Sequence, residues 1–68
     1  MIGVVDYLAP ARGFGYIREN GTERTYWFHA TALVGLDFAE ALQGERVEFD
    51  VIETAKGSEA QAVRPVSF

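Results

Sequence analysis

The stretch Arg-Gly-Phe-Gly-Tyr-Ile at residues 12–17 limits the fold of this chain more than any other segment. Successive side chains of a β-strand point to opposite faces. Read as a strand, the stretch has two unlike faces: Arg12, Phe14 and Tyr16 on one, and Gly13, Gly15 and Ile17 on the other. The first face shows two rings beside a guanidinium group, which suits flat ligands such as nucleic-acid bases. The alternative is a glycine-rich strand whose two rings face solvent by chance, and this stretch alone favours neither.

Five segments are predicted to be short strands, because they are rich in β-branched and aromatic residues. They are residues 3–8, 12–19, 25–29, 46–53 and 60–66. The second and third are expected to form a hairpin, since Asn20-Gly21 between them is a turn signal. Residues 30–44 make one long connection, in which we expect two helical turns. This arrangement predicts an all-β fold, a small five-stranded antiparallel barrel.

The length of 68 residues is that of one domain, and we expect a single domain over residues 1–68. The chain contains no cysteine, which excludes a disulfide framework and a thiolate metal site. Residues 1–6 lack the basic segment that begins a signal peptide. No stretch approaches the roughly 20 apolar residues of a membrane span. We therefore expect a soluble cytoplasmic protein that does not enter a membrane.

The charge balance opposes a nucleic-acid ligand. Six Lys and Arg against ten Asp and Glu give a formal net charge of −4. Phosphate neutralisation by basic side chains supplies most of the non-specific affinity for nucleic acids. For a small domain, however, the distribution of charge over its faces matters more than the total.

A second aromatic group stands at Tyr26-Trp27-Phe28-His29. All four side chains are rings, so alternation does not say which pair is buried. If Trp27 and His29 face the same side as Phe14 and Tyr16 of the neighbouring strand, four rings form one continuous surface. The other two rings of the segment then point into the barrel.

Together these segments resemble the bacterial cold-shock domain. Gly-Val-Val at residues 3–5 precedes the two motifs at residues 12–17 and 27–29, in the order and separation of the family. The family motifs read Lys-Gly-Phe-Gly-Phe-Ile and Val-Phe-Val-His. The resemblance covers nearly the whole chain. It implies an OB-type barrel that binds single-stranded RNA or DNA by stacking bases on surface rings.

The resemblance also implies which residues contact the ligand. Phe14, Tyr16, Trp27 and His29 match the stacking residues of the two motifs, and Arg12 replaces the motif lysine with its charge kept. Two further rings match by position: Tyr7 stands where the family has its first-strand tryptophan, and Phe38 stands at an aromatic position of the long loop. The predicted nucleic-acid-binding residues are therefore Tyr7, Arg12, Phe14, Tyr16, Trp27, His29 and Phe38.

Four positions depart from the family pattern. Asp6 stands where a lysine is usual, which reverses a charge beside the predicted binding face. Leu8 and Ala30 stand where the family usually has phenylalanine, so two stacking surfaces shrink or vanish. Thr25 replaces the usual acidic residue before the second motif. The resemblance therefore implies the fold and the binding face of the family, whereas these four departures argue against its typical affinity.

The expected function is single-stranded nucleic-acid binding with low sequence specificity, in the role of an RNA chaperone or a gene-expression regulator. The alternative is a module that uses the same aromatic face for protein contact, including contact with a second copy of itself as a homodimer. Enzymatic activity is not expected, because His29 is the only histidine and has no visible catalytic or metal-binding partners. No cofactor and no metal are expected.

Overall fold

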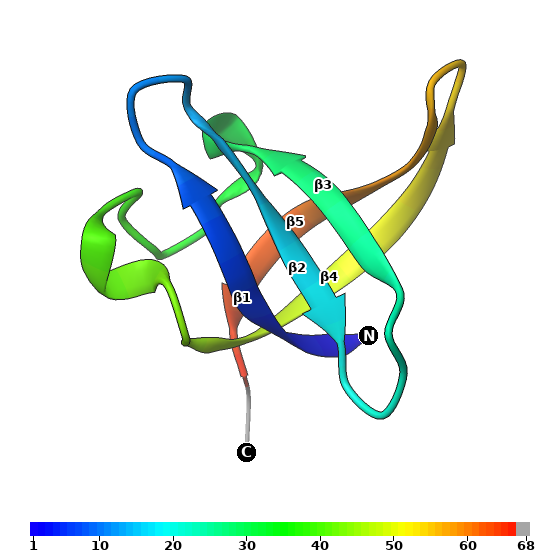
Figure 1. The fold of residues 1–68 in the computed structure, drawn as a ribbon, viewed down its shortest axis with the longest axis horizontal. Coiled ribbons are helices and arrows are strands. Elements are labelled where there is room, and N and C mark those ends of the chain that lie inside the picture. The colour runs from blue at the N-terminus through cyan, green and yellow to red at the C-terminus, as the bar shows by residue number, and fades with distance from the viewer. Residues whose placement is uncertain (67–68) are drawn as a thin grey trace.

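The computed structural model describes residues 1–66, in which five strands close into a barrel of the OB type (Figure 1). The strands are β1 (Ile2–Ala9), β2 (Phe14–Glu19), β3 (Thr25–His29), β4 (Arg46–Thr54) and β5 (Gly57–Pro65). Their order around the barrel is β1-β2-β3-β5-β4, and β4 pairs with β1 to close it. The strand pairs are antiparallel except for β3 with β5, which is parallel. The all-β barrel prediction is confirmed. Residues 67 and 68 of the predicted domain lie outside the described residues.

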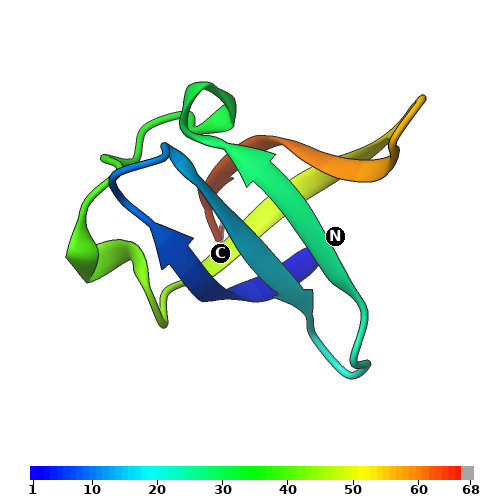
Figure 2. The same ribbon diagram turned by 45° about the horizontal axis from the view of Figure 1, so that its top comes forward.

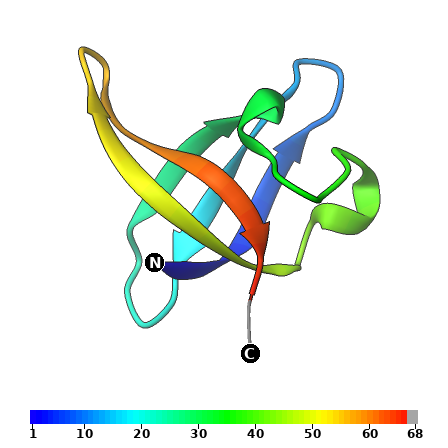
Figure 3. The same ribbon diagram turned by 180° about the vertical axis from the view of Figure 1, so that it is seen from behind.

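The barrel has two sides that matter for the site. β1, β2 and β3 lie side by side toward the viewer in Figure 1, whereas the view from behind in Figure 3 brings β4 and β5 forward. The long connection leaves the end of β3 and carries two 3-10 turns, η1 (Ala30–Ala32) and η2 (Glu40–Leu42), as Figure 2 shows. It returns to β1, where the Gly44 amide donates to the Val5 carbonyl at 2.8 Å. The two expected helical turns are therefore present.

A closed hydrophobic core fills the barrel. Its buried members come from all five strands and both 3-10 turns: Val5, Leu8, Ile17, Tyr26, Phe28, Ala32, Leu42, Val47, Phe49, Ala60 and Val63. The Tyr26 ring lies 5.6 Å from that of Phe49, and its hydroxyl donates to Glu19 Oε1 at 3.2 Å. Burying one large apolar side chain such as Phe28 contributes about 1.5–3 kcal/mol. Burial of Tyr26 and Phe28 confirms the expected inner pair of the second motif.

Gly15 is required by close packing rather than by backbone conformation. A Cβ atom at this position would lie 2.5 Å from the Tyr7 carbonyl oxygen and 2.9 Å from Cε1 of Phe28. Such distances are too short for any side chain, so only glycine lets β1 and the Phe28 ring approach β2 this closely. Gly15 therefore lets the Phe28 ring of β3 fill the core beneath β2.

One sequence prediction about the first motif is wrong. β2 begins at Phe14, not at Arg12, because residues 10–13 form a turn. The amides of Arg12 and Gly13 both donate to the Ala9 carbonyl at 3.0 Å, and Gly13 has a φ of 72°. Pro10 and the left-handed Gly13 favour a turn over a strand here. Strand alternation therefore does not position Arg12.

The last strand is also longer than expected. β5 begins at Gly57 rather than at residue 60, so β4 and β5 form a hairpin with Ala55 and Lys56 at its tip. The Thr54 hydroxyl closes this turn, because it donates to the Gly57 carbonyl at 2.7 Å and accepts from the Lys56 amide. The hairpin extends away from the barrel (Figures 1 and 3). Among residues 1–66, no helix is long and apolar enough to cross a membrane.

Candidate nucleic-acid interface

Strand register brings five rings together on the outer face of β1, β2 and β3. Tyr16 pairs with Tyr7 on one side and with Trp27 on the other. In the next row, Phe14 pairs with Ala9 and with His29. We call these five rings the aromatic platform: Tyr7, Phe14, Tyr16, Trp27 and His29. The predicted common face of the two motifs is confirmed by this register.

A β-bulge in β1 adds Tyr7 to this face. Val5 pairs with Ile17 and Tyr7 pairs with Tyr16, so β1 has one more residue, Asp6, than its partner. Because of this extra residue, Asp6 and Tyr7 are both exposed although they are neighbours, whereas Val5 and Leu8 are buried. Simple alternation from Val5 would turn Tyr7 inward. The bulge thus places a ring on the platform and a carboxylate beside it.

The rings of the platform lie close enough to form one surface. Trp27 and Phe14 are nearly parallel, with centroids 6.2 Å apart and an angle of 27° between planes. Tyr7 lies 6.2 Å from Tyr16 and 6.4 Å from Phe14, and Trp27 lies 6.1 Å from His29. Tyr7 is 50% exposed and Tyr16 is 37% exposed, which leaves ring surface open to a ligand. Several adjacent faces of this kind suit successive bases of a single strand.

Hydrogen bonds fix the orientation of His29. Its Nδ1 accepts from the Thr31 amide at 3.1 Å and lies 2.9 Å from the Thr31 hydroxyl. An amide can only donate, so Nδ1 carries no proton in this arrangement, and the neutral ring has its N–H at Nε2. His29 also caps η1 through this contact. Thr31 was not identified from the sequence, because a histidine followed two residues later by a threonine is not among the recognised turn signals.

Two predicted site residues lie outside the platform. Arg12 is exposed in the turn between β1 and β2, next to Ala9 and Phe14 at the edge of the platform. Phe38 is partly buried, and its ring meets the core ring of Phe28 edge-on at 6.4 Å. Ligand contact by Phe38 remains a prediction, and the contacts that the structure gives this ring are with the core.

The departures from the family pattern have distinct structural consequences. Leu8 is only 7% exposed and belongs to the core, so it offers no stacking surface. Asp6 is exposed in the bulge beside Tyr7. Ala30 begins η1 directly after His29 and is partly buried. The platform therefore depends on five rings and has an acidic group at its β1 edge.

Charge is distributed unevenly around the barrel. Arg64 of β5 pairs with Glu48 at 3.1 Å and with Asp50 at 3.4 Å, both on β4 behind the platform. These are the ion pairs found among residues 1–66. Part of the negative total thus lies on the face away from the rings.

A groove borders the platform, and it was not predicted from the sequence. It has a volume of about 520 Å³ and lies between Tyr16 and Trp27 on one side and the β4–β5 hairpin on the other. The parallel pairing of β3 with β5 places Glu59 opposite Trp27, and Lys56 lines the same groove. No local sequence signal predicts the pairing of Trp27 with Glu59, because these residues are more than 30 positions apart.

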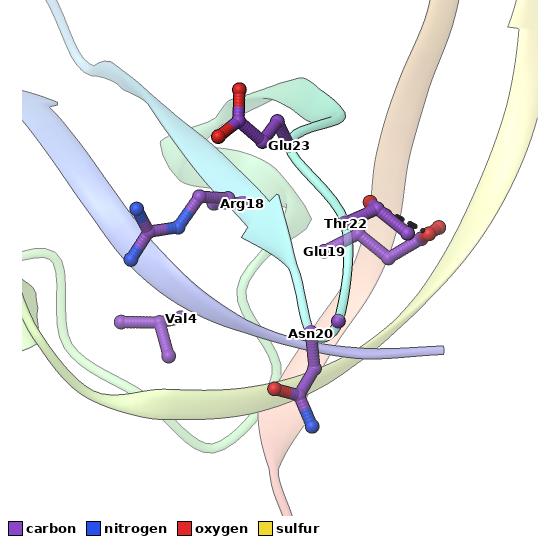
Figure 4. A pocket seen from close by; sticks show the side chains of 7 residues that line it. Val4, Arg18, Glu19, Asn20, Thr22 and Glu23 are labelled. Carbon is purple, nitrogen blue, oxygen red and sulfur yellow. Dashed lines mark hydrogen bonds between the residues drawn. The ribbon is translucent and has the colours of Figure 1, made fainter.

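At the opposite end of β2, the β2–β3 turn forms a smaller polar pocket of about 350 Å³ (Figure 4). Arg18 continues the outward row of β2 and pairs with Val4 and Thr25. Figure 4 shows its guanidinium group over β1, on the side of Val4, whereas the hydrogen bond between Thr22 and Glu19 lies on the other side of the turn. Carboxylates and a charged guanidinium line this pocket, so it suits polar groups rather than a stacked base.

The closed five-stranded barrel places this chain in the class of small OB-type β-barrels. Residues 1–66 match the family described as the 'cold-shock' DNA-binding domain, and the chain belongs to that family. It is 34% identical over 64 residues to the cold shock-like protein CspA of Stigmatella aurantiaca, with 94% of each chain covered. It is 34% identical to a cold shock-like protein of Aquifex aeolicus, covering 91% of this chain and 89% of the relative. It is also 36% identical to Y-box-binding protein 1 of Xenopus laevis, where the match covers 93% of this chain and 22% of that protein.

Proposed function

We propose that the platform binds single-stranded RNA or DNA by stacking successive bases on its rings, with low overall sequence specificity. The observation that carries the proposal is the outward row of Tyr7, Tyr16 and Trp27 joined to the row of Phe14 and His29. Every base has a π-face, so such a surface accepts any sequence. Arg12 is exposed in the turn that leads into Phe14, and Lys56 lines the groove beside Tyr16 and Trp27, so both are assigned to contacts with backbone phosphates.

The energetics agree with a stacking mechanism. Each well-stacked base contributes about 1–3 kcal/mol. Micromolar affinity requires about 8 kcal/mol. Three or four stacked bases together contribute about 3–12 kcal/mol, so they reach this range when each base stacks near the upper end of its value, and the few phosphate contacts help to offset the cost of ordering the strand. The net charge of −4 therefore limits the affinity without preventing binding.

We assign the protein the role of a cytoplasmic RNA chaperone or gene-expression regulator, working as one domain over residues 1–68. Binding without catalysis is the simplest use of the platform. His29 is the only histidine of the chain, and its Nδ1 already accepts a hydrogen bond from the Thr31 amide. The relatives described as cold shock-like are of the same size class, since the match covers about nine-tenths of each.

One alternative has structural support. Tyr7 and Tyr16 are unusually exposed for large rings, and Asp6 beside them repels phosphate. An exposed ring surface of this kind also suits a protein partner. In that case the platform is an interface between two copies of the chain, and nucleic-acid affinity is weak.

A titration with oligothymidine separates the two functions. Trp27 is the only tryptophan and lies in the platform, so its fluorescence reports stacking directly. The proposal predicts saturable quenching at micromolar ligand and a monomer on gel filtration. Unchanged fluorescence together with a dimer supports the protein interface instead.

A further inference from the structure

Two arginines flank one valine on the outer surface of the barrel, beyond the platform. Val4 of β1 pairs with Arg18 of β2 on one side and with Arg46 of β4 on the other. Both arginines are exposed, and the next residue of β4, Val47, is fully buried, so Arg46 points outward. Val4 is only partly buried between them. We call Arg18, Val4 and Arg46 the arginine row.

The arginine row continues the platform. Arg18 follows Tyr16 by two residues on the same face of β2, which is a step of about 7 Å along the strand. Arg18 and Arg46 are two strands apart, which is roughly 10 Å between their backbones. A strand of nucleic acid that stacks on Tyr16 and runs on in this direction therefore meets two guanidinium groups in succession.

Neither guanidinium group is neutralised within the described part of the chain. The ion pairs of residues 1–66 all involve Arg64, so Arg18 and Arg46 have no carboxylate within 4.0 Å there. Figure 4 shows the Arg18 side chain extended across β1 toward Val4. Glu23 lines the same pocket and lowers the local positive potential without pairing with Arg18. Unpaired cations with outward-facing N–H donors are suited to an anionic partner.

We propose that Arg18 and Arg46 bind phosphate groups of the single strand where it leaves the platform, so that the binding path crosses β1 toward β4. Guanidinium groups present several N–H donors in a plane and match phosphate oxygens well. The row carries no exposed ring, so it contributes charge and no stacking. This inference rests on the proposed function, because the platform must hold the strand that the arginine row then follows.

The inference makes a specific claim about ligand length. A short oligothymidine that covers only the platform does not reach the arginine row. A longer one does, and it gains up to two phosphate contacts. Two contacts steepen the slope of log K against log salt by about 1.4, since each contributes about −0.7 for single strands. Exposed charge pairs are weak, so we expect a gain in affinity of about tenfold at about 50 mM salt.

The experiment compares the parent with the double variant Arg18→Gln, Arg46→Gln over oligothymidines of about four to about ten nucleotides, using Trp27 quenching. The double variant should bind short ligands as the parent does and lose the gain that longer ligands give. The control is Arg24→Gln, which removes an exposed cation that lies outside the arginine row. Arg64 is not a suitable control, because it pairs with Glu48. The variant Arg18→Lys, Arg46→Lys should keep most of the gain. Circular dichroism establishes that each variant is folded.

Two results overturn the inference while the proposed function stands. One is a double variant that binds long ligands as tightly and with the same salt slope as the parent. The other is a double variant whose affinity falls equally at every length, or no further than that of Arg24→Gln, since either shows a general charge effect. If the parent fails to bind short ligands as well as long ones, the proposed function itself fails, and the inference fails with it.

Discussion

Tyr7 and Tyr16 face each other across β1 and β2 with ring centroids 6.2 Å apart, because the bulge at Asp6 shifts the register of β1 by one residue. This single extra residue decides whether the first strand contributes a ring to the binding face. It also places a carboxylate next to that ring. Affinity should therefore be sensitive to both residues, in opposite directions.

Tyr7→Ala should weaken single-strand binding by about 1–3 kcal/mol, since it removes one stacking surface. Half of the Tyr7 side chain is exposed, so the free energy of unfolding should change much less. Titration of Trp27 fluorescence measures the affinity, and urea unfolding measures the stability. Ile52→Ala is the matched control, because Ile52 is 40% exposed on the β4–β5 hairpin and lies outside the platform. If the parent and Tyr7→Ala bind with equal affinity, β1 is not part of the binding face.

Asp6→Lys should tighten binding and steepen its salt dependence, because it replaces an anion beside Tyr7 with a cation that reaches a phosphate. One new contact adds about −0.7 to the slope of log K against log salt. The control is Glu40→Lys, which makes the same change of charge on the exposed η2 turn. If both variants tighten binding equally, the effect comes from net charge and not from the position of Asp6.

The structure changes what we expect of Leu8→Phe. By resemblance to the family, a phenylalanine here would add a stacking surface, but Leu8 is a core residue whose Cδ2 lies against Gly15. A larger ring should overpack this region and lower the free energy of unfolding by about 1–3 kcal/mol. The midpoint of urea unfolding tests this. A variant that is as stable as the parent and binds more tightly would show that the ring turns outward onto the platform.

Glu59→Gln should tighten binding severalfold, because it removes a negative charge that faces Trp27 across the groove. Gln61 Nε2 donates to Glu59 Oε1 at 3.2 Å, and an amide oxygen at position 59 can accept the same bond. Glu53→Gln on the same hairpin is the control, since it removes an equal charge and keeps an acceptor for the Ser58 hydroxyl. If both variants gain the same affinity, the gain comes from the change in total charge and not from the position of Glu59.

Much of the fold and most of the platform could be predicted from residues close together in the sequence. The Asn20-Gly21 turn predicts the hairpin, and alternation places Phe14 and Tyr16 on one face. The resemblance to the cold-shock family assigns Trp27 and His29 to the same face, and the register confirms this. Arg12 was misplaced because alternation was extended into a turn, where Pro10 and the left-handed Gly13 bend the chain.

Features that depend on how strands pair, rather than on residues within one strand, could not be predicted. The bulge at Asp6 leaves no local signal, since it is defined by the pairing of β1 with β2. The pairing of Trp27 with Glu59 and of Val4 with Arg46 joins strands that are separated by tens of residues. Loop closure over such distances is governed by the packing of the whole barrel and not by nearby residues.

The salt dependence of binding tests the central claim, that stacking and not charge holds the strand. The ligand is the shortest oligothymidine that saturates the quenching of Trp27, so that only phosphates near Arg12 and Lys56 are in reach. Two neutralised phosphates predict a slope of log K against log salt of about −1.4. Raising salt from about 50 to about 200 mM should then cost roughly tenfold in affinity, and the stacking part should persist. A slope steeper than about −4 would contradict the account, because it requires a basic binding surface larger than the platform and its two edge cations provide.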